Sequence, residues 1–391
     1  MKLKFLTWVI AMAMLPVTSL RAERHENDRR DDEAESQHED IEDRDVTSGV
    51  YTMDNSPAGN KVWAFGRRPD GALTSAKLHP TGGRGTGSGL GNQGAVLLSH
   101  DGRWLFVCNP GSDEVSVFAV TPRGLTLSDR VSSEGRQPVS LTLHRNLLYV
   151  LNAGGAVGGA DSIAGFVFAH GRLVPLLGAI HRLSADNTAP AQIAFTHDGD
   201  HLVVTEKATA LIDTFTLGDD GLVSSAKMFT SPAAPPFGFA TGRHNRIFVT
   251  QAAGGAGNPG ASSVSSYEVA EDGDLVVISD SVASFQTAAC WMVLTGNEHF
   301  AFAANTPNDS ISSYRVGSDG TLELLKSQAA LTGAGSGPAD MALSRDNRFF
   351  YGLTAGRGAI LSFRLNAGNG ELQPLSGGGT VPTTANGLAA Q

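Results

Sequence analysis

Residues 190–206 read PAQIAFTHDGDHLVVTE, two short apolar runs on either side of the turn sequence HDG. Such runs around a turn that contains Asp and Gly predict a β-hairpin. Comparable hairpin sequences recur at intervals of roughly 45 to 53 residues, with starts at Gln93, Pro138, Pro236, Ala289 and Pro338. The chain is therefore built from an internal repeat, and the repeat decides the fold.

A second pair of short strands follows each hairpin. After residues 190–206 these runs are IDTFTL (212–217) and GLVSSAKM (221–228), separated by Asp219 and Asp220. The repeating unit is therefore four antiparallel strands. Because one four-stranded sheet leaves its faces uncovered, the units must stack on one another, and four strands at this period are typical of propeller blades.

The two ends of the chain complete one further unit. GVYTMDNSPAGNKVWAFGRRPDGALTSAKL (49–78) contains the last three strands of a repeat, and ANGLAAQ (385–391) supplies the missing first strand. Closing the ring in this way removes the open sheet edges. We therefore predict that residues 49–391 form an all-β, seven-bladed β-propeller of four-stranded antiparallel blades, closed by pairing of the C-terminal strand with the N-terminal blade.

The N-terminal residues differ from the repeat. Residues 1–22 have the order of a secretory signal peptide, because Lys2 and Lys4 precede an apolar run that ends near small residues. Residues 23–48 are rich in acidic side chains and too poor in apolar ones to bury a core, which predicts a disordered leader. We expect a periplasmic or secreted protein without membrane insertion after the signal is removed.

Composition excludes several other classes of protein. The chain has 391 residues, a net charge of −10 and two cysteines, so it is neither a basic nucleic-acid-binding protein nor a disulfide scaffold. Cys108 and Cys290 fall in distant blades of the predicted ring, so we expect two buried thiols. We expect no cofactor and no metal, a monomeric chain, and an unidentified small-molecule ligand or protein partner.

Each predicted second strand ends in a polar residue. These positions form a ring on the face that carries the loops after the second strands, and they are Asn55, Asn109, Asn152, Glu206, Gln251, Asn305 and Thr354. An amide there can bind a ligand or bond to the start of the loop. We take Asn109, Asn152, Gln251 and Asn305 as candidate ligand-binding residues. Trp291 joins them because it stands in a first-strand slot that would line the central channel.

The repeats and the strands that end in Asn or Glu resemble the seven-bladed propeller lactonase family, which includes propeller-type 6-phosphogluconolactonases and carboxy-muconate cyclases. The resemblance covers residues 49–391. Family enzymes carry a Glu at the end of a second strand, and Glu206 in TEKA matches that position. They also carry a basic residue where this chain has Ala191 and Gln192, and a His where it has QPV (137–139), one residue after Arg136.

The resemblance implies a lactonase with Glu206 as acid/base, since opening a lactone needs proton transfer and stabilisation of developing negative charge. Arg136 and Lys207 are the candidate partners for that charge. The missing basic residues favour the alternative, a non-catalytic propeller that binds a ligand or a protein through its loop face.

Overall fold

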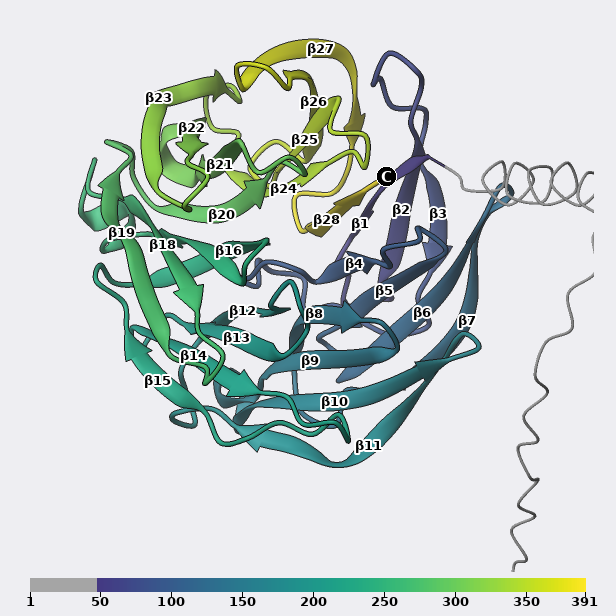
Figure 1. Cartoon of the computed structure of the whole chain (residues 1–391). Coiled ribbons are helices and arrows are strands. Elements are labelled where there is room, and N and C mark those ends of the chain that lie inside the picture. Colours follow the sequence, from purple (N-terminus) through teal and green to yellow (C-terminus); the bar gives the residue numbers. More distant parts are fainter. Residues whose placement is uncertain (1–47) are drawn as a thin grey trace, which may run out of the picture. The chain divides into compact units, whose positions relative to one another are not determined.

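The structure is a computed structural model that describes residues 48–391. The predicted signal peptide (1–22) lies outside the described residues, as does the acidic leader up to residue 47. Seven four-stranded antiparallel sheets follow one another around a ring (Figure 1). The predicted all-β, seven-bladed propeller is therefore confirmed.

The blades follow the chain in order, each with its first strand innermost. Blades one to three contain β28 (Asn386–Ala390), β1 (Gly49–Met53), β2 (Lys61–Gly66) and β3 (Lys77–Pro80); β4 (Val96–Leu98), β5 (Trp104–Asn109), β6 (Glu114–Thr121) and β7 (Gly124–Ser132); and β8 (Pro138–His144), β9 (Leu147–Ala153), β10 (Asp161–Ala169) and β11 (Arg172–Arg182). Blades four and five contain β12 (Pro190–Phe195), β13 (His201–Glu206), β14 (Leu211–Thr216) and β15 (Lys227–Thr230); and β16 (Pro236–Gly242), β17 (Arg246–Gln251), β18 (Ser263–Val269) and β19 (Leu275–Ala283). Blades six and seven contain β20 (Ala289–Leu294), β21 (Phe300–Asn305), β22 (Ser310–Val316) and β23 (Leu322–Leu331); and β24 (Pro338–Leu343), β25 (Phe349–Thr354), β26 (Ala359–Asn366) and β27 (Glu371–Thr380).

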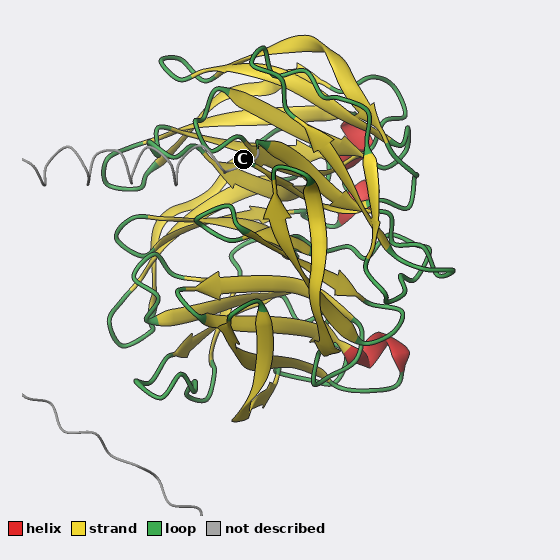
Figure 2. Ribbon diagram, turned by 90° about the vertical axis from the view of Figure 1, so that its right-hand side faces the viewer, coloured by secondary structure: helices red, strands yellow, loops and turns green. Residues whose placement is uncertain are grey.

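The ring has two distinct faces. The loops after the second strands and the connections between blades lie on one, which we call the loop face, and the turns within the first and last strand pairs lie on the other, the turn face. Three short 3-10 helices mark the loop face on one side of the molecule in Figure 2: η2 (Gly154–Val157), η3 (Gly255–Gly257) and η4 (Thr306–Asn308).

The first turn of each hairpin has a local cause. In blade four, Thr196 Oγ1 donates to Asp198 Oδ1 at 2.7 Å, and the same oxygen accepts the Asp200 N–H at 3.0 Å. Gly199 has a φ of +84°, and a Cβ there would lie 2.4 Å from His144 Nε2 in the adjacent blade three. Glycine is therefore required both for the left-handed backbone and for the close approach.

The C-terminal strand closes the ring as predicted. β28 pairs antiparallel with β1, with Val50 opposite Ala390 and Tyr51 opposite Ala389 (Figure 1). Leu388 is buried, and its backbone N–H donates to Asp340 Oδ2 of blade seven at 3.0 Å. The last strand thus joins the first blade and contacts the preceding one.

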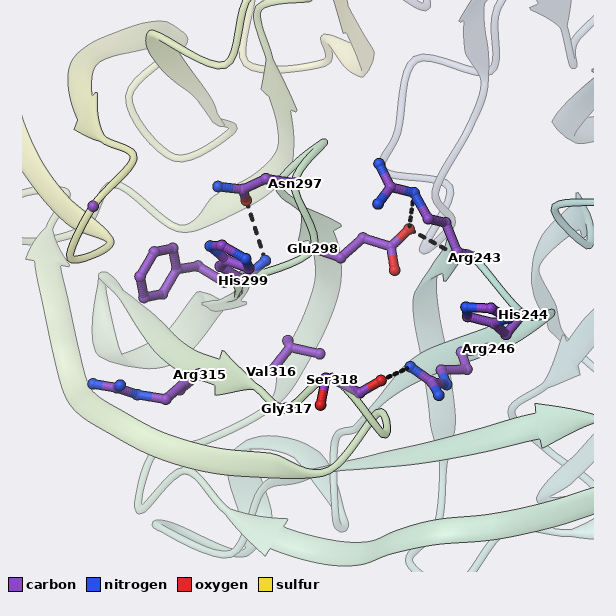
Figure 3. Close-up of a pocket in the computed structure, with 12 residues that line it drawn as sticks. Arg243, His244, Arg246, Asn297, Glu298, His299, Arg315, Val316, Gly317 and Ser318 are labelled. Atoms are coloured by element: carbon purple, nitrogen blue, oxygen red, sulfur yellow. Dashed lines mark hydrogen bonds and ion pairs between the residues drawn. The ribbon is translucent and has the colours of Figure 1, made fainter.

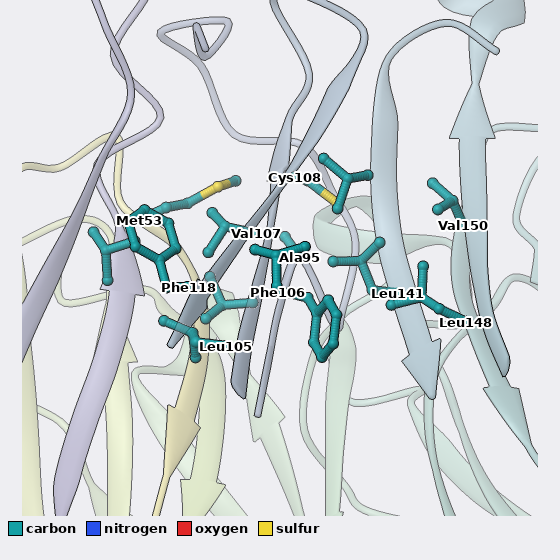
Figure 4. Close-up of a cluster of buried hydrophobic side chains, with 14 of the residues drawn as sticks. Met53, Ala95, Leu105, Phe106, Val107, Cys108, Phe118, Leu141, Leu148 and Val150 are labelled. Atoms are coloured by element: carbon teal, nitrogen blue, oxygen red, sulfur yellow. The ribbon is translucent and has the colours of Figure 1, made fainter. Parts of the chain in front are cut away.

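Buried side chains fill the space between blades. Around β5, Phe106, Val107 and Cys108 are fully buried and lie among side chains of the adjacent blades (Figure 4). Cys108 and Cys290 are both buried and free, which confirms the expected thiols. Among the described residues, no helix is long and apolar enough to cross a membrane.

Candidate functional site

The predicted polar ring on the loop face is present but buried. All seven positions are at 0% exposure: Asn55, Asn109, Asn152, Glu206, Gln251, Asn305 and Thr354. Asn109 Nδ2 donates to Ser116 Oγ at 2.8 Å, and Asn305 Nδ2 donates to Ser312 Oγ at 2.9 Å. These amides hold the third strand of their own blade, so the placement does not support their assignment as ligand-binding residues.

Asn152 and Gln251 each bond to the connection that leads into their own blade. Asn152 Nδ2 donates to the Ser133 carbonyl at 3.1 Å, and Gln251 Nε2 donates to Ser231 Oγ at 3.2 Å. The Oε1 atom of Gln251 accepts the Ser263 and Ser265 hydroxyls. The ring therefore fixes the blade-to-blade connections, which is the second role that an amide could have at this position.

Glu206 occupies the same structural slot in blade four. It ends β13 and is fully buried, and its carboxylate accepts the Ser184 N–H at 3.0 Å together with the Ser184 and Thr209 hydroxyls. Glu206 is therefore enclosed by loop-face connections in this structure. Its role as acid/base stays a prediction.

Asp213 on β14 makes the blade-four slot chemically different from the others. It is fully buried and stands where Ser116 and Ser312 stand in their blades, and neither of its oxygens accepts a hydrogen bond from an N–H or hydroxyl group. Burial, and then the hydrogen bond and negative charge of Glu206, raise the pKa of Asp213 to about 9. Asp213 therefore keeps its proton at neutral pH and can donate it in a hydrogen bond to Glu206.

Lys207 points away from this pair and anchors a chain segment across the loop face. Its Nζ donates to the carbonyls of Gly91 and Pro190 and lies 4.8 Å from the centre of the Phe237 ring. Burial lowers the pKa of Lys207 to about 8. The lysine is therefore held by backbone oxygens and an aromatic ring, rather than by Glu206.

Residues 90–93 cross the loop-face end of the ring. Trp291 Nε1 donates to the Asn92 carbonyl at 2.8 Å, and Gln93 exchanges two hydrogen bonds with the backbone of Met292 at 2.7 and 3.1 Å. We call residues 90–93 the cross-segment. The end of the Gly-rich stretch 85–94 therefore joins blade two to blade six, and Trp291 packs against it.

Arg136 lies apart from these groups. Its Nη1 donates to the Val157 carbonyl at 2.8 Å, and its Nε lies 3.7 Å from Asp113 Oδ2. Half of the side chain is exposed. The predicted trio of Glu206, Lys207 and Arg136 is thus distributed over three separate sets of contacts.

A central channel of about 1030 Å³ remains on the other side of the cross-segment. Its wall is made by first strands of several blades, and its opening is on the turn face, beside His100, His144 and His197.

A second hollow of about 500 Å³ lies at the rim of the turn face between blades five and six (Figure 3). Arg243 faces Glu298, whose Oε1 accepts the Arg243 backbone N–H at 2.7 Å, and Arg246 Nη1 donates to the Ser318 carbonyl at 2.7 Å. Arg315 lies 3.7 Å from Glu323. Three arginines that line this hollow therefore already have partners within the protein: Arg243, Arg246 and Arg315. Among residues 48–391, no group of three or more His, Cys, Asp or Glu could hold a metal ion.

The fold and the buried ring define a closed seven-bladed propeller whose loop face is crossed by its own chain. Residues 58–157 and 204–387 match the family model described as "Lactonase, 7-bladed beta-propeller". The chain belongs to this lactonase family. The gap between the matched segments contains Ala191 and Gln192, where the expected basic residue is missing.

Solved structures share the fold. The periplasmic gluconolactonase PpgL of Pseudomonas aeruginosa superposes with a TM-score of 0.71 at 15% identity, covering 88% of this chain and 98% of that one. Putative 6-phosphogluconolactonases of Bacteroides fragilis and Bacteroides uniformis give TM-scores of 0.66 and 0.68 at 17% and 15% identity. They cover 88% of this chain and 98% and 100% of their own. No curated protein matches the sequence.

Proposed function

We propose that this protein is an exported lactonase that hydrolyses a lactone or similar ester of a small carbohydrate or acid. Family membership supports the reaction class. The observation that carries it is the Glu206–Asp213 pair, in which Glu206 and the protonated carboxyl group of Asp213 lie side by side near the strand end where the family carries its Glu. Such a pair can both accept and donate a proton, as lactone opening requires.

Access to the pair needs a local opening. Ser184 and Thr209 cover Glu206, and both belong to loop-face connections rather than to strands. Displacing the connection around Ser184 would expose the carboxylate without disturbing a blade. The named gluconolactonase and 6-phosphogluconolactonase neighbours make sugar-acid lactones the first substrates to test.

The test is a panel of sugar-acid and simple lactones at about pH 6 to 8, where an acid/base group can act. Wild-type protein is compared with Glu206→Gln and with Gln251→Asn, which alters the equivalent slot of blade five without touching a carboxylate. We expect Glu206→Gln to lose about 100-fold or more in kcat, the usual contribution of general acid–base catalysis. Gln251→Asn should retain the wild-type rate.

Wild-type rates at the uncatalysed background would refute the proposal, as would equal rates for wild type and Glu206→Gln. In that case the second candidate, a non-catalytic ligand-binding propeller, is favoured. The specific observation behind it is that both oxygens of Glu206 already have donors and the cross-segment covers the loop face.

A further inference from the structure

The central channel is a well with one closed end. At that end the Gln93 side chain bonds to Met292 of blade six, and the Gln93 backbone N–H donates to the Ala191 carbonyl at 3.0 Å. Leu90 of the cross-segment packs against two of the buried hydrophobic clusters between the blades. The channel can therefore be reached from the turn face, and its volume of about 1030 Å³ is large enough for an organic ligand of moderate size.

The wall of the well is mixed, and its apolar part comes from the innermost strands. Five side chains that line it are only half-buried although they stand on the innermost strands, and these are Leu97, Leu98, Leu143, Ala194 and Leu343. The exposed part of each faces the channel. Apolar area kept in contact with water in a concave site is the usual mark of a ligand pocket rather than of a structural void.

The deep wall carries one titratable group, Asp340 on β24. It is 2% exposed, and its two oxygens accept the backbone N–H groups of Met341 and Leu388 at 2.8 and 3.0 Å. Burial raises the pKa of Asp340 to about 8, so at neutral pH the group is an uncharged O–H donor. The amide of Gln192, which also lines the well, is already bonded in both directions to Phe239.

The remaining titratable side chains of the lining stand at the opening. His100, Asp101, His144, Arg145 and His197 all belong to first-to-second-strand turns or the strand end beside them. Asp101 Oδ2 accepts a hydrogen bond from Arg103 Nε at 2.9 Å. No fixed charge of the described lining therefore faces a ligand in the interior, which disfavours a charged ligand there.

We propose that the central channel is a binding site, entered from the turn face, for an uncharged ligand with an apolar body and a carbonyl oxygen. The apolar body lies against Leu98, Leu143 and Leu343, and the carbonyl accepts the Asp340 proton. Alkyl-substituted ketones, esters and lactones have this chemistry. The site is separate from the Glu206–Asp213 pair and does not depend on lactone hydrolysis.

The test uses 2-nonanone, which has an alkyl chain and a carbonyl but no bond for a lactonase to cleave. Calorimetric titration of the wild-type protein is expected to show saturable binding of one molecule. Ala194→Phe, which fills the well, should weaken binding at least 10-fold, while Ala169→Phe, at an exposed site on β10, should leave binding unchanged. Leu143→Glu, near the opening, provides a second blocking variant if Ala194→Phe fails to fold.

Absence of binding up to the solubility of 2-nonanone overturns the proposal. Equal binding by wild type and both blocking variants also overturns it, because the ligand would then lie elsewhere. Competition by glucono-δ-lactone at similar concentrations would refute the ligand class. Since 2-nonanone is not hydrolysed, none of these outcomes depends on the proposed lactonase activity, which Glu206→Gln tests separately.

Discussion

Replacing Asp213 by Asn should stabilise the protein, and the gain should grow with pH. Asp213 has a pKa near 3.8 when unfolded and about 9 in the folded protein. A carboxyl group with a raised folded pKa contributes its full stability below about pH 4 and loses it as pH rises towards 9. Asn cannot ionise, and its amide N–H can donate to Glu206 as the Ser265 hydroxyl donates to Gln251 Oε1 in blade five.

The magnitude follows from the pKa difference. Between pH 3.8 and pH 7 the wild-type protein must retain a proton that the unfolded chain releases, which costs about 4 kcal/mol at roughly 1.4 kcal/mol per pH unit. The difference in unfolding free energy between Asp213→Asn and wild type should therefore be small at pH 4 and approach this value at pH 7. Asp340 and Lys207 titrate in both proteins, so their contributions cancel.

The assay is guanidinium unfolding followed by circular dichroism at several pH values between about 4 and 9, where stability linked to the shifted group changes. Ser312→Ala serves as the control, since it alters the equivalent third-strand position of blade six without a titratable group. If wild type and Asp213→Asn show parallel stability–pH curves, Asp213 does not keep its proton at neutral pH and the reasoning is refuted.

Other features give further expectations. A chain ending at Ala385 lacks β28 and exposes the β1 edge. Loss of Leu388 burial costs about 2 kcal/mol and each lost hydrogen bond costs about 1 kcal/mol, so the melting temperature should fall. An unchanged melting temperature would contradict ring closure. Burial raises the pKa of the Cys108 thiol and raises that of Cys290 to about 12, so neither thiol should react with a thiol reagent until guanidinium is added. Rapid labelling of the native protein would show that the two thiols are not buried. Gln93→Ala removes both bonds to Met292 and should speed amide exchange in residues 90–93, whereas Gln192→Ala, which breaks a similar clamp between blades four and five, should not.

The propeller could be predicted because its determinants are local and repeated. The Asp-Gly turns and the alternation of apolar residues act within each hairpin, and ANGLAAQ supplies the one strand that 49–78 lacks. The cross-segment could not be predicted in this way. It has no periodicity, and its partners Trp291 and Met292 lie 199 residues away.

The candidate site was only partly predictable for a similar reason. Glu206 was identified as an exception to the Asn pattern, but its donors Ser184 and Thr209 come from connections without repeat signatures. One usable signal was present: the ring residue and its third-strand partner are seven positions apart in Asn109–Ser116, Asn305–Ser312 and Glu206–Asp213. Considering the two substitutions together would have indicated a pair of neighbouring carboxyl groups instead of a single acid.

The cross-segment also constrains the order in which the chain can fold. Residues 90–93 are made early, but their bonding partners in blade six follow only after 199 further residues, and the edge of β1 is unpaired until β28 is complete. An emerging chain therefore carries an open strand edge and an unanchored segment until its last residues are available. Such edges promote pairing with other chains, so this protein should be most prone to aggregation as a nascent or truncated polypeptide.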